Sequence, residues 1–181
     1  MRDNGAEQVR VRTRGGTARS TSRPPRYGCC FSGRMSDATF RDLLMHDHER
    51  LDGQLQAILE LGCIDDTPDL DRAWGAFEDG LLAHLDGEEM FLLPTLARDD
   101  PATATRIRDE HAELRSHVAE IGIGLELHNV REERLRVLAA QLRAHAKMEE
   151  APLYGWADTA LPPSHFTSLV RRLRRARRLD T

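Results

Sequence analysis

Two copies of one histidine–carboxylate motif stand 61 positions apart in this sequence. The copies are His84–Glu89 and His145–Glu150, and each reads His-x-x-x-Glu-Glu. Residues four apart on a helix lie on the same face, one turn from each other. The His and the first Glu of each copy can therefore hold one metal ion together or reach two neighbouring ions.

A shorter motif precedes each copy and repeats after 63 positions. It reads acid-His-x-x-Leu and occurs as Asp47–Leu51 and as Glu110–Leu114. Mixed imidazole and carboxylate ligands suit iron, zinc or manganese, and no cysteine accompanies the motifs to indicate a softer metal. The two half-chain repeats predict a metal site with internal two-fold symmetry. Its candidate ligands are His48, His84, Glu88, His111, His145 and Glu149.

The elements that must position these side chains are helices, because apolar residues recur at spacings of three and four. The first helix is expected to run from Ser36-Asp37 to Gly62, and the second from about Asp69 to Leu93, with Pro94 closing it. The third is expected to begin at Asp99-Asp100-Pro101 and the fourth near Val130. Four helices of roughly 25 residues, joined by short loops, predict an all-α, antiparallel, up-down-up-down four-helix bundle.

All six candidate ligands fall on the apolar stripes, where Leu or Phe would otherwise pack. Unpaired ionisable groups in a bundle core would each cost on the order of several kcal/mol. Bound cations would neutralise the carboxylates and occupy the imidazole nitrogens, which favours metal coordination. Acidic neighbours of the ligands suit acceptors for the ligand N–H groups, although a solvated helix face would look the same. These neighbours are Asp47, Glu89, Glu110 and Glu150.

Periodicity separates the candidate ligands from the other histidines. His46 and His117 stand two and six residues from the nearest candidate, off the apolar stripe, and are expected to be solvated. His165 belongs to the tail. A further His-x-x-x-Glu pair, His128 with Glu132, spans a helix junction and is assigned to chance.

Charge divides the chain into three parts. Residues 1–34 carry a net charge of +6 and residues 161–181 a net charge of +5, which leaves −15 on residues 35–160. The predicted domains are accordingly a disordered basic extension, an acidic bundle and a basic amphipathic tail helix. Three cysteines form no disulfide framework, and neither a signal peptide nor a membrane-spanning run is found. A cytoplasmic protein that binds neither nucleic acid nor membrane is expected.

The two basic ends leave alternatives open. Met35 stands directly before the first helix cap, which favours a natural start there and makes residues 1–34 an over-extended reading frame. A basic arm that touches nucleic acid or acidic lipid is the alternative. The tail helix, with Leu169 and Leu173 on its apolar face, is expected to dock on the acidic bundle rather than bind a membrane surface, nucleic acid or a partner.

In order and spacing, these motifs resemble the hemerythrin-like, or HHE cation-binding, domain family. The similarity covers about Ser36 to Trp156 and includes a Leu-x-Pro that follows the first His-x-x-x-Glu-Glu. The resemblance implies a four-helix bundle around an oxygen-bridged pair of non-haem irons. It also implies that the four candidate histidines are terminal ligands, while Glu88 and Glu149 bridge the metals.

One position departs from the oxygen-carrying hemerythrins, which have a second His four residues after the third-helix His. Arg115 stands there, so plain O2 carriage is not expected, and water in preference to Asp52 would fill the vacant position. The predicted function is binding or sensing of O2 or NO, or buffering of iron. The alternative is a di-iron enzyme that acts on peroxide or NO, or an iron donor for cluster repair. A single metal held by two His and one carboxylate also remains open.

Overall fold

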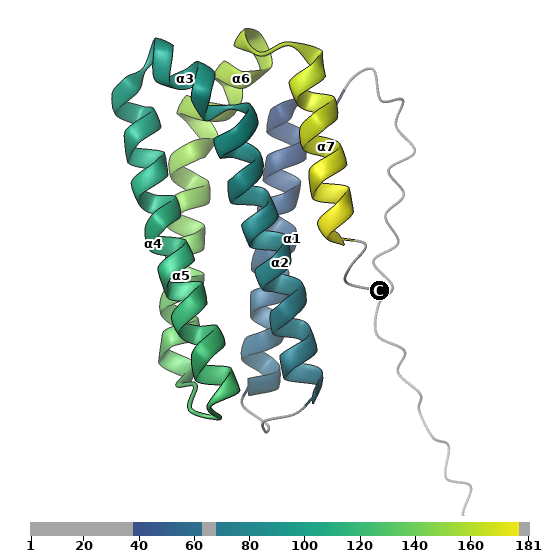
Figure 1. Cartoon of the computed structure of the whole chain (residues 1–181), viewed down its shortest axis with the longest axis vertical. Helices are drawn as coiled ribbons and strands as arrows, with labels where there is room; N and C mark the ends of the chain where they lie inside the picture. The colour runs from purple at the N-terminus through teal and green to yellow at the C-terminus, as the bar shows by residue number, and fades with distance from the viewer. Residues whose placement is uncertain (1–37, 63–67, 178–181) are drawn as a thin grey trace, which may run out of the picture. The chain divides into compact units, whose positions relative to one another are not determined.

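Figure 1 shows the computed structural model of the chain, in which residues 38–62 and 68–177 are described. Every regular element in these ranges is a helix, which confirms the all-α class. The long helices are α1 (Phe40–Gly62), α2 (Pro68–Phe91), α4 (Pro101–Glu126) and α5 (Glu132–Glu149). The shorter ones are α3 (Leu93–Asp99), the π-helical segment η1 (Glu150–Tyr154), α6 (Gly155–Ala160) and α7 (Pro163–Arg177). The disordered extension predicted for residues 1–34 lies outside the described residues.

The four long helices lie side by side, and the chain reverses direction from each one to the next (Figure 1). α1 packs against α2 and α5, and α4 packs against the same two helices. Each long helix therefore turns one face towards a shared interior. Among the described helices, none combines the length and apolarity needed to cross a membrane.

Two helix boundaries show how local sequence determines the connections. α4 begins at Pro101, with Pro in the first turn as predicted, and Asp100 caps it, since its side chain accepts a hydrogen bond from the Thr103 N–H over 3.0 Å. Pro94, however, does not close the second helix. α2 ends earlier, at Phe91, and Pro94 lies in the first turn of α3, where its missing N–H would have had no helical acceptor.

The apolar core consists of two clusters at different heights along the bundle. One includes Leu51 and Phe77, and the other includes Leu44, Leu93 and Ile107, all of them buried. The level between the clusters is the level of the predicted ligands. Apolar layers on both sides keep water from that level and so strengthen the electrostatic interactions within it.

Helix α7 packs along α2 (Figure 1). Its residues Leu169 and Leu173 are buried, and Arg172 Nε donates a hydrogen bond to the Ala83 carbonyl oxygen over 3.2 Å. A Cβ atom on Gly87 would lie only 2.5 Å from Leu169 Cδ1, so the absence of a side chain at Gly87 permits this close approach. The tail helix thus docks on the bundle, which is the arrangement that the sequence favours.

Candidate metal centre

The six predicted ligands converge in the interior from all four long helices. All are buried, with exposed fractions between 0% and 7%. The i, i+4 spacing turns both residues of each His-x-x-x-Glu pair inward on one helix face. α1 carries His48, α2 carries His84 and Glu88, α4 carries His111, and α5 carries His145 and Glu149.

Glu88 lies between histidines of two different helices. Its Oε1 is 3.5 Å from His84 Nε2, and its Oε2 is 3.3 Å from His111 Nε2. Two ligands of one cation, each about 2.1 Å from it and at right angles, are themselves about 3 Å apart. The separations around Glu88 are therefore close to those of atoms that share a cation, and longer than a strong hydrogen bond.

Glu149 occupies the corresponding place on the opposite helix. Its Oε1 is 3.5 Å from His111 Nε2, and its Oε2 is 3.4 Å from His145 Nε2 and 3.8 Å from His48 Nε2. Two groups of possible ligand atoms result, and within each group all the atoms lie within 4.8 Å of one another. Glu149 belongs to both groups, as a carboxylate that bridges two cations would. The groups are Glu88, His111, His145 and Glu149, and His48, His84 and Glu149.

One ring nitrogen of each candidate histidine, Nε2, is buried without a hydrogen-bond partner among the described residues, and so are one oxygen of Glu88 and one of Glu149. A buried polar atom without a partner costs about 1–3 kcal/mol. Cations coordinated by these atoms would satisfy all six at once. The side chains present therefore fit a metal centre with nitrogen and oxygen ligands.

The other ring nitrogen, Nδ1, has a hydrogen-bond partner on each of the four histidines. Three partners are the acidic residues that the sequence predicts. They are Asp47 for His84 at 3.0 Å, Glu89 for His111 at 2.9 Å and Glu110 for His145 at 3.2 Å. A carboxylate at Nδ1 keeps the proton there, which leaves the Nε2 lone pair for a metal.

The prediction that Glu150 is the fourth acceptor for a ligand N–H is wrong. Its side chain lies 3.6 Å from Arg41 at the surface, whereas His48 Nδ1 lies 3.0 Å from the hydroxyl of Tyr154. The same hydroxyl donates to Glu149 Oε2 over 2.8 Å. Tyr154 is therefore a further residue of the centre, and the motif search missed it.

The backbone of η1 explains why Tyr154 was missed. α-Helical periodicity continues the inward stripe of α5 from Glu149 to Leu153, but the π-helical turn carries one more residue and buries Leu153 and Tyr154 alike. Pro152 lies inside this turn and cannot donate the N–H that a regular α-helix requires. Pro152 is thus the one signal in the sequence that predicts a change of register here.

Asp47 and His48 have strongly shifted pKa values. Burial opposes ionisation of Asp47, but the hydrogen bond and charge of His84, together with the charge of Arg50, hold the Asp47 pKa well below its usual range. Burial and the charge of His84 lower the pKa of His48 to about 3. His48 is therefore neutral at neutral pH, as a metal ligand must be.

The two carboxylates bring negative charge into an apolar core. Burial and the charge of Glu149 raise the pKa of Glu88. Burial opposes a proton on His111, but the neighbouring Glu149 and Glu88 outweigh it and raise the His111 pKa to about 10. In the metal-free protein, protons therefore compensate the negative charge of the carboxylates. Bound cations would compensate the same charge.

Two polar residues weighed from the sequence lie outside the groups of possible ligand atoms. Asp52 pairs with Arg143, with 2.8 Å between Oδ1 and Nε, and is not directed at the centre. Arg115 pairs with Asp86 at 2.8 Å and with Glu89 at 3.1 Å. The position where oxygen carriers have a further His therefore holds a salt bridge instead.

The three histidines His46, His117 and His165, which the sequence places outside the candidate ligands, differ in their surroundings. His46 is exposed, as expected. His117 is half-buried, and its Nδ1 lies 2.5 Å from Gln141 Oε1. His165 is half-buried on α7 beside the ring of Phe91, with 6.3 Å between the ring centroids. None of the three belongs to either group of possible ligand atoms.

An all-helical bundle with four buried imidazoles around two buried carboxylates defines a class of protein suited to hold cations in its core. Residues 39–157 match the family model of the hemerythrin HHE cation binding domain. This match covers well over half of the chain, and the protein belongs to that family. Comparison with curated proteins and with solved structures gives no match.

Proposed function

We propose that the protein is a non-haem di-iron protein that binds or senses O2 or NO, or buffers iron, in the cytoplasm. The observation that carries the proposal is the set of four buried Nε2 atoms and two carboxylate oxygens that have no hydrogen-bond partner within residues 38–62 and 68–177. Iron suits this mixture of imidazole and carboxylate donors. His48, His84, His111 and His145 would be the terminal ligands, and Glu88 and Glu149 would be shared between the two irons.

The chain's own residues prepare the centre in three ways. The partners at each Nδ1 fix the imidazole tautomers, and the apolar clusters above and below exclude water. The two carboxylates lie between the histidines and supply the negative charge that two cations need. When bound, iron supplies reversible binding of small ligands and a change of oxidation state.

Metal analysis with an optical spectrum tests this proposal on the full-length protein purified without chelator. Two irons per chain and an absorption band that changes on reduction and on exposure to O2 or NO are expected. His48→Ala should lose iron, whereas His46→Ala, which removes an exposed imidazole two residues away, should retain it. Zinc alone, or a single iron, in the wild-type protein would contradict the di-iron assignment.

Action on peroxide or NO is the second candidate function, and Tyr154 favours it. A buried phenol within 2.8 Å of Glu149 and 3.4 Å of Glu88 can supply a proton inside the centre. Peroxide consumption by the iron-loaded protein should then fall about 100-fold in Tyr154→Phe, the lower end of what general acid catalysis contributes. Turnover no faster than that of free iron would leave binding as the function.

A further inference from the structure

Helix α7 reaches the candidate metal centre through its last residue, Arg177. The Arg177 guanidinium donates from Nη2 to Asp47 Oδ1 over 2.6 Å. Asp47 is fully buried, and its other oxygen, Oδ2, lies 3.0 Å from His84 Nδ1. The match to the family ends at residue 157, so α7 lies beyond the shared domain and yet touches a residue that holds a ligand histidine.

We propose that α7 is a functional part of the metal centre, in which Arg177 is a positioning residue that acts on His84 through Asp47. The inference rests on the proposed function, because His84 is one of the proposed iron ligands. Asp47 Oδ1 accepts hydrogen bonds from both Arg177 and Arg50, the latter over 2.9 Å. A single buried carboxylate is thus shared between a ligand imidazole and two guanidinium groups.

The charge on Asp47 determines how strongly His84 donates electrons. A carboxylate that accepts the N–H of a ligand imidazole makes the ring a more basic ligand. A guanidinium on the same carboxylate weakens this effect, because it compensates part of the negative charge. Arg177 therefore moderates His84 as a ligand, and its removal should stabilise ferric over ferrous iron and lower the reduction potential.

A second route leads from α7 to another candidate ligand, His111. Arg172 of α7 forms an ion pair with Asp86, and Asp86 pairs with Arg115 at 2.8 Å. Arg115 also pairs with Glu89 at 3.1 Å, and Glu89 Oε1 lies 2.9 Å from His111 Nδ1. Two arginines of one helix are thus connected through side chains to two of the four candidate histidines.

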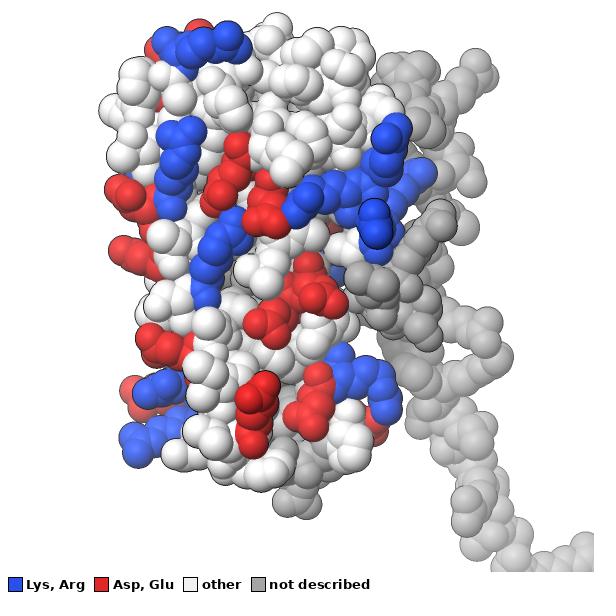
Figure 2. Space-filling view, viewed as in Figure 1, with Lys and Arg blue, Asp and Glu red and all other residues white. Residues whose placement is uncertain are grey.

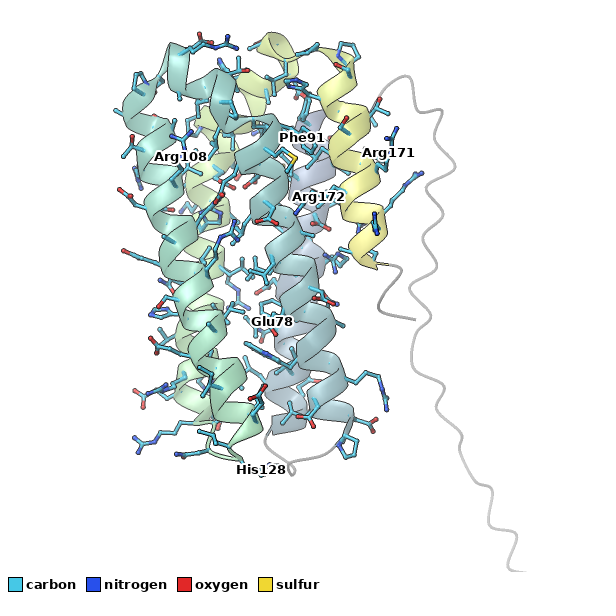
Figure 3. All side chains as sticks on the ribbon, in the orientation of Figure 1. Glu78, Phe91, Arg108, His128, Arg171 and Arg172 are labelled. Carbon is cyan, nitrogen blue, oxygen red and sulfur yellow. The ribbon has the colours of Figure 1, made fainter. Side chains whose placement is uncertain are left out.

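The other arginines of α7 provide a contrast. Arg171 and Arg174 are exposed, and Figure 3 shows Arg171 pointing away from the bundle while Arg172 extends towards α2. Figure 2 shows arginine side chains gathered over α7 beside acidic side chains of the bundle. Arg174 has the same charge as Arg177 and lies on the same helix, but it has no hydrogen bond to Asp47. It is therefore the matched control.

The test compares Arg177→Met, Arg177→Lys and Arg174→Met in the full-length protein. Three quantities are measured: the reduction potential of bound iron, the iron affinity by chelator competition, and the ¹⁵N NMR signal of the His84 imidazole in metal-free protein. Arg177→Met should lower the potential, strengthen the binding of ferric relative to ferrous iron about tenfold and shift the His84 signal. Arg177→Lys should keep all three quantities close to their wild-type values, because it retains the positive charge. Arg174→Met should match the wild type.

Undocking of α7 is tested separately with the double variant Leu169→Ala/Leu173→Ala, which removes two buried contacts of the helix. It should reproduce the change of potential, since it withdraws Arg177 along with α7. If this variant and Arg177→Met both keep the wild-type potential and His84 signal, the inference is overturned. Failure of the proposed function is distinct: the wild type would bind no iron, while the His84 signal of the metal-free protein would still respond to Arg177→Met.

Discussion

The Tyr154 hydroxyl lies 2.8 Å from Glu149 Oε2, although the two residues are five positions apart and an α-helix aligns residues three or four apart. The π-helical turn of η1 makes this contact possible, because it adds one residue to the turn that follows Glu149. An irregular backbone segment therefore completes the Nδ1 partners of the four histidines. Its position directly after a helix that carries two candidate ligands agrees with the tendency of π-helical turns to occur at functional sites.

Replacing Tyr154 by Phe should weaken iron binding about tenfold, measured by competition with a chelator. Phe keeps the ring in place but removes the hydroxyl that orients His48 and Glu149. Trp156→Phe is the control, because it removes a hydrogen bond in the neighbouring turn, from Nε1 to Asp99, that does not reach the centre. Equal affinities for the two variants would show that the hydroxyl does not orient the ligands.

Among the acidic neighbours of the ligands, Glu110 and Glu150 should differ in their effect on the metal. Glu110→Ala removes the acceptor 3.2 Å from His145 Nδ1, and iron affinity should fall between about 10-fold and 100-fold. Glu150→Ala removes a surface carboxylate beside Arg41 and should leave the affinity unchanged. Loss of affinity in both variants would indicate a general effect of negative charge rather than the orientation of an imidazole.

The sequence was sufficient to predict the four long helices and the convergence of the six candidate ligands, because both follow from regular periodicity. His48, His84, His111 and His145 stand where an apolar residue is expected, and residues on one stripe of a helix must face the same interior. The cap at Asp100 could be predicted for a similar reason, since capping depends on residues close together in sequence.

Contacts that depend on irregular backbone or on distant residues could not be predicted. Tyr154 enters the centre only through a π-helical turn, and Arg177 reaches Asp47 from 130 positions away. Charge alone favoured docking of the tail helix on the acidic bundle. It did not indicate which arginines face inward, because that depends on where Gly87 lets α7 approach α2.

The close approach of α7 to α2 should be sensitive to a single methyl group. Gly87→Ala places a Cβ 2.5 Å from Leu169 Cδ1, so the free energy of unfolding should fall by about 1–3 kcal/mol in urea titrations. Adding Leu169→Ala should recover part of this loss, because it removes the atom that clashes.

Gly53 of α1 is the control for this substitution, since an added Cβ there would meet no atom of the described part of the chain within 4 Å. Gly53→Ala should increase stability by about 0.5–1 kcal/mol, the difference in helix propensity between the two residues. If Gly87→Ala has the same free energy of unfolding as the wild type, α7 can shift on α2 without a loss of stability.

Replacing Glu88 by Met should affect the metal-loaded protein far more than the metal-free protein. In the metal-free protein, burial and the charge of Glu149 oppose ionisation of Glu88, as its raised pKa shows. An apolar side chain of similar size removes this cost but also removes the buried partner of His84 and His111, so the free energy of unfolding without iron should change by less than about 2 kcal/mol at pH 7. The wild type should gain about 2.7 kcal/mol from iron at 100 times its dissociation constant, and Glu88→Met should gain far less. Urea titrations with and without iron measure both effects, and a Glu88→Met protein that iron stabilises as much as the wild type would remove Glu88 from the ligand set.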